Sequence, residues 1–408
     1  MLDGLDDVDW ASLEHAYGPA ADVPGHLRGL LDGDAGHRRR ALSGLYGGIC
    51  HQGTRYEASA PAVPFLLELL QDPATPDRAA IAGLVASVAV GLHESWLPGG
   101  FPIAEFRAAA VGGADLLRAA PPPSDEDEDE DDDEDEDEDE NEDENEAGES
   151  RLGYWERLDG AQQEAMAAYV DVAAYDAVRV GQPVLRSLLS DGDATVRAAA
   201  AFTLGWFPED GTGNVAALTA AAADPSRSVA ATALVSLGLL GTAAPAALRD
   251  TKPEIRWAAA TALARVRGAE AGEGAAAELL RWAGGATTAR PGVPFLDGDL
   301  AGYAALSLPS LGDAYAAAAL DALLTRLGTV TGVETLPVLG TALRAVFPGG
   351  PRPAGASLDP SQRRLAGVLA AAPAAWQLGG RRSGNVTGLL RAYGLPGDPA
   401  ELHHLAER

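Results

Sequence analysis

The chain has 408 residues, 47% of them hydrophobic but only 6% aromatic, and its formal net charge at pH 7 is −30. Its single cysteine, Cys50, excludes an internal disulfide and a cysteine-cluster zinc or iron–sulfur site. Lys252, the one lysine, lies in Thr-Lys-Pro, which excludes a P-loop. Abundant alanine and scarce β-branched or aromatic clustering at period two predict an all-α fold.

The start of the chain and its apolar stretches predict a cytoplasmic protein without a membrane segment. Residues 1–9 are acidic, the opposite of the basic start of a signal peptide. Ala79–Leu92 is too short to span a bilayer, which takes about 20 apolar residues. Ser228–Leu248 is long enough, but glycines and Pro245 interrupt it, so we expect a buried helix and a turn there.

An acidic run separates two predicted helices, 103–119 and 154–179. Between Asp125 and Glu146, 20 of 22 residues are Asp or Glu, and without them the formal charge of −30 becomes −10. Self-repulsion predicts a disordered, extended segment. We interpret it as a solvated loop, with a docking arm for a basic partner and weak calcium binding as alternatives. Such charge opposes binding to DNA, RNA or anionic lipid.

A helix–turn–helix unit recurs after the acidic run. The clearest copy is Val184–Phe207, where Asp193 is expected to cap the second helix, because its carboxylate can accept hydrogen bonds from the exposed amides. The unit returns at Asp224–Val229 and Lys252–Arg256. We interpret Asp193, Arg197 and Arg256 as capping and inter-repeat ion-pair residues, and Trp206, Phe207 and Trp257 as core. Looser copies lie at Asp34–Ile49, Asp72–Leu92, Asp297–Leu308 and Gly332–Phe347.

The clearest copy also carries a family pattern. Leu188–Gly205 reads Leu-Leu-x-Asp-x-Asp-x-x-Val-Arg-x-x-Ala-Ala-x-x-Leu-Gly and resembles a bacterial HEAT repeat of the phycobilisome-lyase-like subtype. The stretch from Ala41 to Leu66, with His-Gln-Gly-Thr-Arg-Tyr-Glu-Ala at its centre, is similar to a signature of uncharacterised bacterial HEAT proteins. The resemblance is specific over about residues 181–268, and it implies antiparallel helix pairs stacked into a right-handed superhelix.

Counting helical patterns gives about nine antiparallel pairs in one HEAT-like α-solenoid. Repeat arrays place insertions in loops between helices, so we expect one continuous solenoid rather than two separate domains. The predicted parts are helix pairs over residues 1–120, a disordered acidic insertion over 121–150, and the continuation of the same solenoid over 151–408.

One polar and aromatic cluster stands out in the N-terminal helix pairs. His51 and His93 each follow a second helix and are 42 residues apart, so we expect them on one edge, roughly 10 Å apart. Loop-fixing contacts are one interpretation, a partner-binding rim is another, and a metal site or Cys50–His51 nucleophile is a third. The candidates for partner binding are His51, Gln52, Arg55, Tyr56, His93, Glu94 and Trp96.

These features favour a non-enzymatic protein–protein interaction module or scaffold, of which an immunity or antitoxin-type protein that binds a basic partner is one form. We expect no cofactor, metal, nucleic acid or membrane partner. The alternative, suggested by the name of the repeat subtype, is a lyase-like or other enzyme with its site on the His51/His93 rim. A HEAT protein that processes nucleic acid, akin to the alkyl-purine glycosylases, would need a basic groove, and the charge argues against one.

Overall fold

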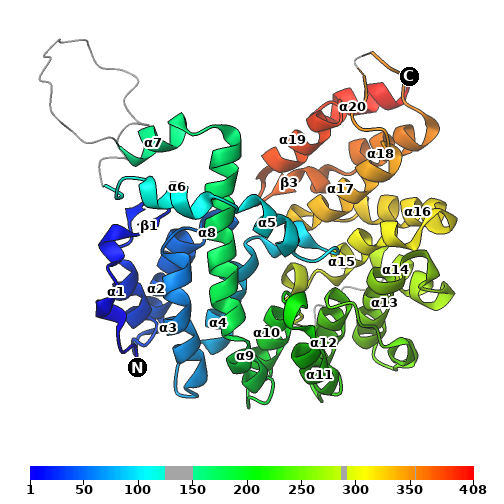
Figure 1. Cartoon of the computed structure of the whole chain (residues 1–408). Helices are drawn as coiled ribbons and strands as arrows, with labels where there is room; N and C mark the ends of the chain where they lie inside the picture. The colour runs from blue at the N-terminus through cyan, green and yellow to red at the C-terminus, as the bar shows by residue number, and fades with distance from the viewer. Residues whose placement is uncertain (125–149, 286–291, 354) are drawn as a thin grey trace, which may run out of the picture. The chain divides into compact units, whose positions relative to one another are not determined.

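The computed structural model describes residues 1–124, 150–285, 292–353 and 355–408 (Figure 1). The predicted disorder of the acidic run, residues 125–146, therefore falls outside the described residues. The described part contains twenty α-helices and two antiparallel hairpins of two-residue strands. The hairpins pair β1 (Glu14–His15) with β2 (Gly18–Pro19), and β3 (Gln377–Leu378) with β4 (Arg381–Arg382). The predicted all-α fold, a solenoid of helix pairs, is confirmed.

The chain packs as two compact units. Unit 1 comprises residues 1–96 and 101–207, and unit 2 comprises residues 97–100 and 208–408. Each unit has its own buried core of alanine, leucine and aromatic side chains. No helix in the described ranges is long and apolar enough to cross a membrane.

Unit 1 is built from stacked helix pairs with one long helix packed against them. Helices α1 and α2, α3 and α4, and α9 and α10 form the pairs; α3 also contacts α9, and α4 contacts α10. The long helix α8 packs on α3, α4, α5 and α6 (Figure 1). The helices are α1 (Val23–Gly29), α2 (Ala35–Ile49), α3 (Ser59–Gln71), α4 (Arg78–Val90), α5 (Ile103–Ala109), α6 (Gly113–Ala119), α7 (Arg151–Arg157), α8 (Gly160–Val180), α9 (Gln182–Leu188) and α10 (Ala194–Leu204).

Unit 2 continues with helices that each pack on a neighbour in the chain or the next but one. Gly238 of α12 lies so close to α13 that an added Cβ would come within 2.7 Å of the Ala262 Cα, so the small residues of this unit allow close helix approach. The helices are α11 (Gly211–Ala221), α12 (Arg227–Leu239), α13 (Pro253–Arg267), α14 (Glu273–Ala283), α15 (Leu300–Ser307), α16 (Ala316–Leu327), α17 (Thr335–Val346), α18 (Pro360–Ala371), α19 (Gly384–Ala392) and α20 (Pro399–Ala406).

Two of the expected helices are interrupted. The predicted helix over 103–119 ends at Ala109 and resumes as α6, because Gly112 between them adopts a left-handed φ of 88°. The predicted helix over 154–179 divides into α7 and α8. Asp159 starts α8 with a capping box, in which its carboxylate accepts from the Gln162 amide and the Gln162 side chain accepts from the Asp159 amide.

The predicted repeat residues have the expected structural roles. The Asp193 carboxylate accepts from the Thr195 amide at 2.8 Å and caps α10. The Arg256 guanidinium pairs with Glu278 of the following helix at 3.5 Å. Trp206, Phe207 and Trp257 are each at most 1% exposed. The capping, ion-pair and core interpretations of Asp193, Arg256 and these aromatic residues are therefore confirmed.

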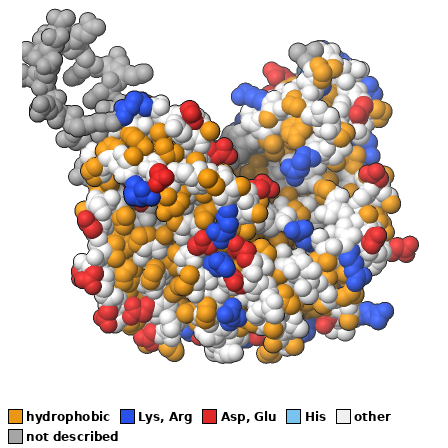
Figure 2. Space-filling view, in the orientation of Figure 1, with side chains coloured by type: hydrophobic (Ala, Val, Ile, Leu, Met, Phe, Trp, Pro, Cys, Tyr) orange, Lys and Arg blue, Asp and Glu red, His pale blue; other side chains and the backbone are white. Residues whose placement is uncertain are grey.

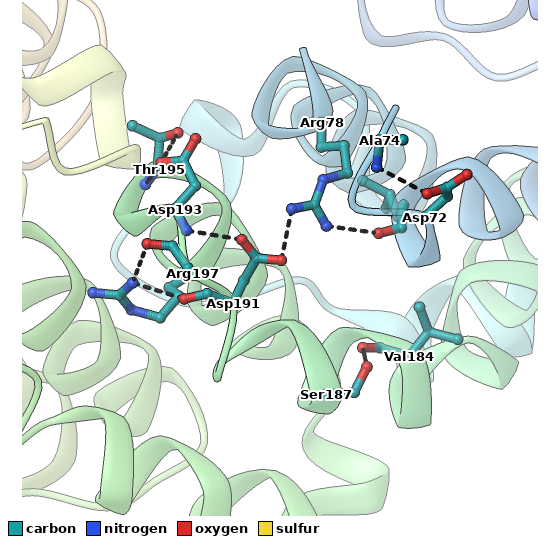
Figure 3. A network of polar contacts seen from close by, with 11 residues as sticks. Asp72, Ala74, Arg78, Val184, Ser187, Asp191, Asp193, Thr195 and Arg197 are labelled. Atoms are coloured by element: carbon teal, nitrogen blue, oxygen red, sulfur yellow. Dashed lines mark hydrogen bonds and ion pairs between the residues drawn. The ribbon is translucent and has the colours of Figure 1, made fainter. Parts of the chain in front are cut away.

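A repeated polar arrangement fixes the turns within the helix pairs. In the turn before α10, Asp191 accepts from the Asp193 amide, and Arg197 donates to the carbonyls of Asp191 and Gly192 (Figure 3). The same contacts join Asp32, Asp34 and Arg38 before α2, and Asp250, Lys252 and Arg256 before α13. The aspartate and arginine are six residues apart each time, so this spacing defines the turn.

Ion pairs join one turn to the next. Arg38 pairs with Asp77 at 2.8 Å. Arg78 pairs with Asp191 at 2.7 Å, as Figure 3 shows. The second pair connects residues 113 positions apart in sequence, which places the pair α9–α10 directly after the pair α3–α4 in the stack. The segment between them, with α5–α8, is thus an insertion between neighbouring helix pairs of unit 1.

Candidate functional site

The loops that follow α2 and α4 meet in unit 1. Each contains a short 3-10 helix, η3 (His51–Gly53) and η4 (His93–Trp96). A Cβ added at Gly53 would lie 2.5 Å from Leu92 Cγ, and one at Gly91 would lie 2.4 Å from the Gly53 carbonyl oxygen. The predicted residues of the two loops therefore belong to one region of the molecule.

Arg55 holds this region together from inside. Its side chain is buried, and its Nε lies 2.8 Å from Asp171 Oδ1 on α8. Its Nη1 donates to the Gly53 carbonyl at 2.9 Å, and its guanidinium lies 6.0 Å from the centre of the Phe101 ring. Arg55 thus anchors the loop after α2 onto the inserted helices and does not face solvent.

Burial shifts the ionisation of two groups beside Arg55. It raises the pKa of Asp171 to about 6, although the positive charge of Arg55 acts in the opposite direction. It also raises the pKa of the Cys50 thiol to about 11. Cys50 is therefore a buried, protonated thiol, which is the opposite of what the Cys50–His51 nucleophile hypothesis needs.

The two histidines have separate neighbours. The His51 ring Nδ1 lies 3.2 Å from the Tyr17 hydroxyl, and the two rings meet edge to face at 5.4 Å. His93 packs edge-on against Phe202, at 5.0 Å between ring centres, and tilted against Trp206 at 6.3 Å. His51 thus lies at the surface with the exposed Tyr17, whereas the His93 ring is packed among aromatic side chains.

The remaining predicted residues also divide into exposed and packed groups. Trp96 donates from Nε1 to the Val90 carbonyl at 2.6 Å and packs against Phe101 and Phe106. Glu94 is half-exposed, with its carboxylate 3.6 Å from the ring nitrogen of His93. Gln52 is exposed and has a left-handed φ of 48°.

Tyr56 faces a hollow in unit 1 with a cavity volume of about 280 Å³. The hollow lies between the β1–β2 hairpin, the loop before α3, and helices α7 and α8. Tyr56 is half-buried, and burial followed by the negative charge of Glu14 raises its pKa, so its hydroxyl stays protonated at neutral pH. The lining residues that matter for its chemistry are Glu14, His15, Tyr56, Arg151, Trp155 and Met166.

Arg151 connects the chain segments on either side of residues 125–149 at the hollow. Its Nε donates to Glu14 Oε2 at 2.6 Å, and its Nη1 donates to the Pro121 carbonyl at 2.7 Å. Its Nη2 forms an ion pair with Glu57. One buried arginine is therefore shared by two carboxylates, and it ties Pro121 to the start of α7.

His15 fixes the hairpin wall of the hollow. Its Nε2 lies 3.0 Å from the Asp22 carboxylate, and its Nδ1 accepts from the Tyr17 amide at 3.2 Å. These contacts hold Tyr17 at the tip of the β1–β2 hairpin, with 55% of its surface exposed. No periodic pattern of the sequence points to Glu14, His15, Tyr17 or Trp155, because these residues lie outside the repeats.

A second, larger cavity of about 980 Å³ follows the turn edge of the first three stacked helix pairs. Arg38, Arg78 and Asp191 line it. Arg38 is paired with Asp77, and Arg78 is paired with Asp191 (Figure 3). Figure 2 shows apolar side chains spread over the face of unit 1 that carries α3 and α8. Within the described ranges, no group of three or more His, Cys, Asp or Glu side chains is placed to hold a metal ion.

Comparison with known proteins identifies the repeat. Residues 182–250 match the family model described as HEAT repeats. The crystal structure of an engineered protein from the Northeast Structural Genomics Consortium is similar with 18% identity and a TM-score of 0.30, over 95% of this chain and 87% of that one. No curated protein matches the chain. The resemblance to HEAT repeats is confirmed for the central segment, and the bacterial, phycobilisome-lyase-like subtype stays a prediction.

Proposed function

We propose that this chain, with its HEAT repeats at 182–250, is a non-enzymatic protein-binding module that holds a basic protein partner at the hollow of unit 1. HEAT repeats stack into extended surfaces that generally bind other proteins. A masking protein of the immunity or antitoxin type and an assembly scaffold are two forms that such a module takes.

The observation that carries this proposal is the position of the hollow. The aromatic side chains of Tyr56 and Trp155 line it, and the hairpin that forms one of its walls carries the exposed Tyr17 at its tip. Aromatic side chains that are partly exposed beside polar groups are typical anchors of protein interfaces. Pro123 also lines the hollow, and the Ser124 carbonyl lies against Gly18 of the hairpin.

Charge supports a basic partner. The 20 acidic residues of the run between Asp125 and Glu146 follow Ser124 in the sequence, and the preceding Pro123 lines the hollow. Negative charge that is close in sequence to an aromatic hollow raises the local concentration of a basic protein and disfavours an acidic one. The same charge disfavours nucleic acid, because phosphate contacts dominate that affinity.

The enzymatic alternative on the His51/His93 rim has less support. His51 contacts Tyr17, and His93 is enclosed by Phe202 and Trp206. The adjacent Cys50 is buried, and its raised pKa keeps it a thiol. These separate environments do not present a nucleophile, a base and an orienting group to one substrate, as the general arrangement for nucleophilic catalysis requires.

Affinity capture from an extract of the source cells tests the proposal. The immobilised full chain is compared with the double variant Tyr56→Ala/Trp155→Ala and with the matched control Tyr315→Ala in unit 2. Circular dichroism verifies that each variant is folded. We expect the wild type and the control to retain the same specific protein and the double variant to lose it. Retention of that protein by all three would contradict a contact surface at the hollow.

A further inference from the structure

The hollow has the size of a single side chain. Its cavity volume of about 280 Å³ lies just below the range of about 300–1,000 Å³ that is usual for pockets that enclose whole small-molecule ligands. Two of its walls are held in place by ion pairs. His15 pairs with Asp22 and fixes the β1–β2 hairpin, and Arg151 pairs with Glu14 and fixes the start of α7. A partner that binds here can therefore insert one residue into a preformed recess.

The walls combine aromatic surface with apolar surface. Tyr56 and Trp155 contribute aromatic rings, and the buried Met166 of α8 contributes a thioether. Leu152, which is 39% exposed, also lines the hollow. Such a surface suits a side chain with a long aliphatic stem and a flat, delocalised head, because rings attract cations over their faces.

One carboxylate oxygen of the hollow, Oε1 of Glu14, is available as a hydrogen-bond acceptor. Glu14 uses Oε2 for Arg151, while its Oε1 accepts no hydrogen bond from the residues that the structure describes. The Tyr56 hydroxyl likewise has no hydrogen-bond partner among them. Glu14 and Glu57 together carry two negative charges against the one positive charge of Arg151, so the three groups sum to one net negative charge.

We propose that this hollow receives the side chain of an arginine from the basic partner, with the guanidinium bound to Glu14 Oε1 and stacked on the rings of Tyr56 and Trp155. The inference rests on the function proposed above and names the group that the partner supplies. A guanidinium is planar and carries several N–H donors in a fixed fork, so it can stack and bind a carboxylate at the same time. A lysine ammonium offers the charge without the plane, and a carboxylate or phosphate would face the Glu14 carboxylate.

The test uses short peptides that differ only in one side chain. The full chain is labelled with 5-fluorotryptophan, which gives one ¹⁹F NMR signal for each of its seven tryptophans, and Trp155→Phe assigns the signal of Trp155. Acetyl-Gly-Gly-Arg-Gly-Gly-amide is titrated against the same peptide with citrulline, which keeps the shape of arginine but lacks its charge. We expect the Trp155 signal to shift and saturate with arginine, and the citrulline peptide to bind at least about tenfold more weakly.

Two variants test which side chains contribute to the binding of arginine. Glu14→Gln removes the proposed acceptor charge and is expected to weaken arginine binding by roughly tenfold, with the exposed Glu156→Gln of the neighbouring α7 as the matched control. Because Glu14→Gln also alters the contact with Arg151, Tyr56→Phe provides a milder change, which removes only a hydroxyl and is expected to weaken binding several-fold. Equal binding of arginine and citrulline, or no effect of either variant, would overturn the proposal.

The same variants separate this inference from the proposed function. If the hollow variant Tyr56→Ala/Trp155→Ala loses the captured protein but the peptides show no preference for arginine, the module binds at the hollow without an arginine anchor. If the arginine peptide saturates the Trp155 signal while the double variant still captures the partner, the hollow binds arginine but the principal contact surface for the partner lies elsewhere.

Discussion

The pair formed by Arg55 and Asp171 connects the stacked helices of unit 1 to its inserted helix α8. Two charges are removed from water here, and burial disfavours the charged form of each. Gly91 makes room for the pair, because a Cβ at its φ of 65° would lie 2.1 Å from Arg55 Nη1. A glycine is therefore required where α4 ends, for conformation and for space.

Removal of the arginine should raise the pKa of Asp171 further. That pKa is about 6 because burial raises it more than the positive charge of Arg55 lowers it. Arg55→Met removes the lowering effect and keeps the effect of burial. ¹³C NMR titration of the aspartate carboxyl carbons measures the shift. Arg107→Met is the control, since Arg107 contacts Asp176 on the same helix and its loss should leave the pKa of Asp171 nearly unchanged. A fall in that pKa on Arg55→Met would contradict the assignment.

The raised pKa also predicts how stability depends on pH. Between the unfolded pKa of about 3.9 and the folded pKa of about 6, the folded chain holds a proton on Asp171 that the unfolded chain has released. The contribution of Asp171 to stability is therefore present below about pH 4 and is lost as pH rises to 6. Relative to Asp171→Asn, the wild type should lose roughly 1–3 kcal/mol of unfolding free energy over this window, measured by urea denaturation at each pH. A difference between the two proteins that does not change with pH would count against it.

The turn contacts that repeat along the helix pairs have unequal energetic weights. Arg78 and Asp191 form an ion pair with side chains 9% and 13% exposed, whereas Arg118 and Asp115 form one with side chains 74% and 81% exposed. Because Asp191→Asn can still accept from the Asp193 amide, it removes the charge and keeps the turn. Arg78 then stays buried without a counter-charge, which lowers the stability of the folded state.

We expect Asp191→Asn to lower the unfolding free energy by about 2–4 kcal/mol, since loss of one partner of a buried pair is strongly destabilising. Asp115→Asn should change it by less than about 0.5 kcal/mol, because exposed pairs contribute little. Chemical denaturation of both variants at the same salt concentration makes the comparison. Similar losses in the two variants would show that the turn pair is not the link between α4 and α10.

The crossing of α12 and α13 gives a prediction about packing. A Cβ at Gly238 would meet the Ala262 Cα at 2.7 Å and its Cβ at 2.9 Å, so Gly238→Ala pushes two helix backbones apart. Overpacking of this kind costs about 1–3 kcal/mol. Gly367→Ala in α18 meets nothing within 4 Å, and it should instead stabilise by about 0.5–1 kcal/mol through helix propensity. Opposite signs in thermal denaturation confirm the close crossing, and equal signs contradict it.

Patterns within one repeat were predictable, whereas contacts across the insertion were not. Asp193 and Arg256 were identified because capping and inter-repeat pairing recur at a fixed spacing from the helix start. Asp171 and Glu14 lie outside any period, and their ion-pair partners are distant in sequence. Trp155 also lies outside any period. Tyr56 was identified among the candidates, but its hollow depends on α7 and α8, which no local pattern places beside it.

The whole-molecule charge leads to a prediction about rates. Most of the net charge of −30 comes from the 20 acidic residues of the run between Asp125 and Glu146, next to the hollow in sequence. Exposed charges of this kind act through long-range attraction, which steers a basic partner toward the site and weakens with salt. The helices set what the module can bind, and the run should set how fast a basic partner arrives.

Neutralisation of the run, with each Asp changed to Asn and each Glu to Gln between Asp125 and Glu146, should slow association with a fluorescent oligoarginine peptide. Stopped-flow fluorescence in about 0.01 M salt, where the Debye length is about 30 Å, is expected to show a rate constant at least roughly tenfold lower than that of the wild type. In about 1 M salt the two rates should converge, since attraction is screened beyond about 3 Å, and an oligoglutamate peptide should bind neither protein. The association rate is the quantity to measure, because electrostatic steering acts mainly on it. Without its 20 acidic residues the formal charge of −30 becomes −10. Equal rates of the two proteins at low salt would contradict the prediction and would mean that this remaining charge and the hollow itself direct the encounter.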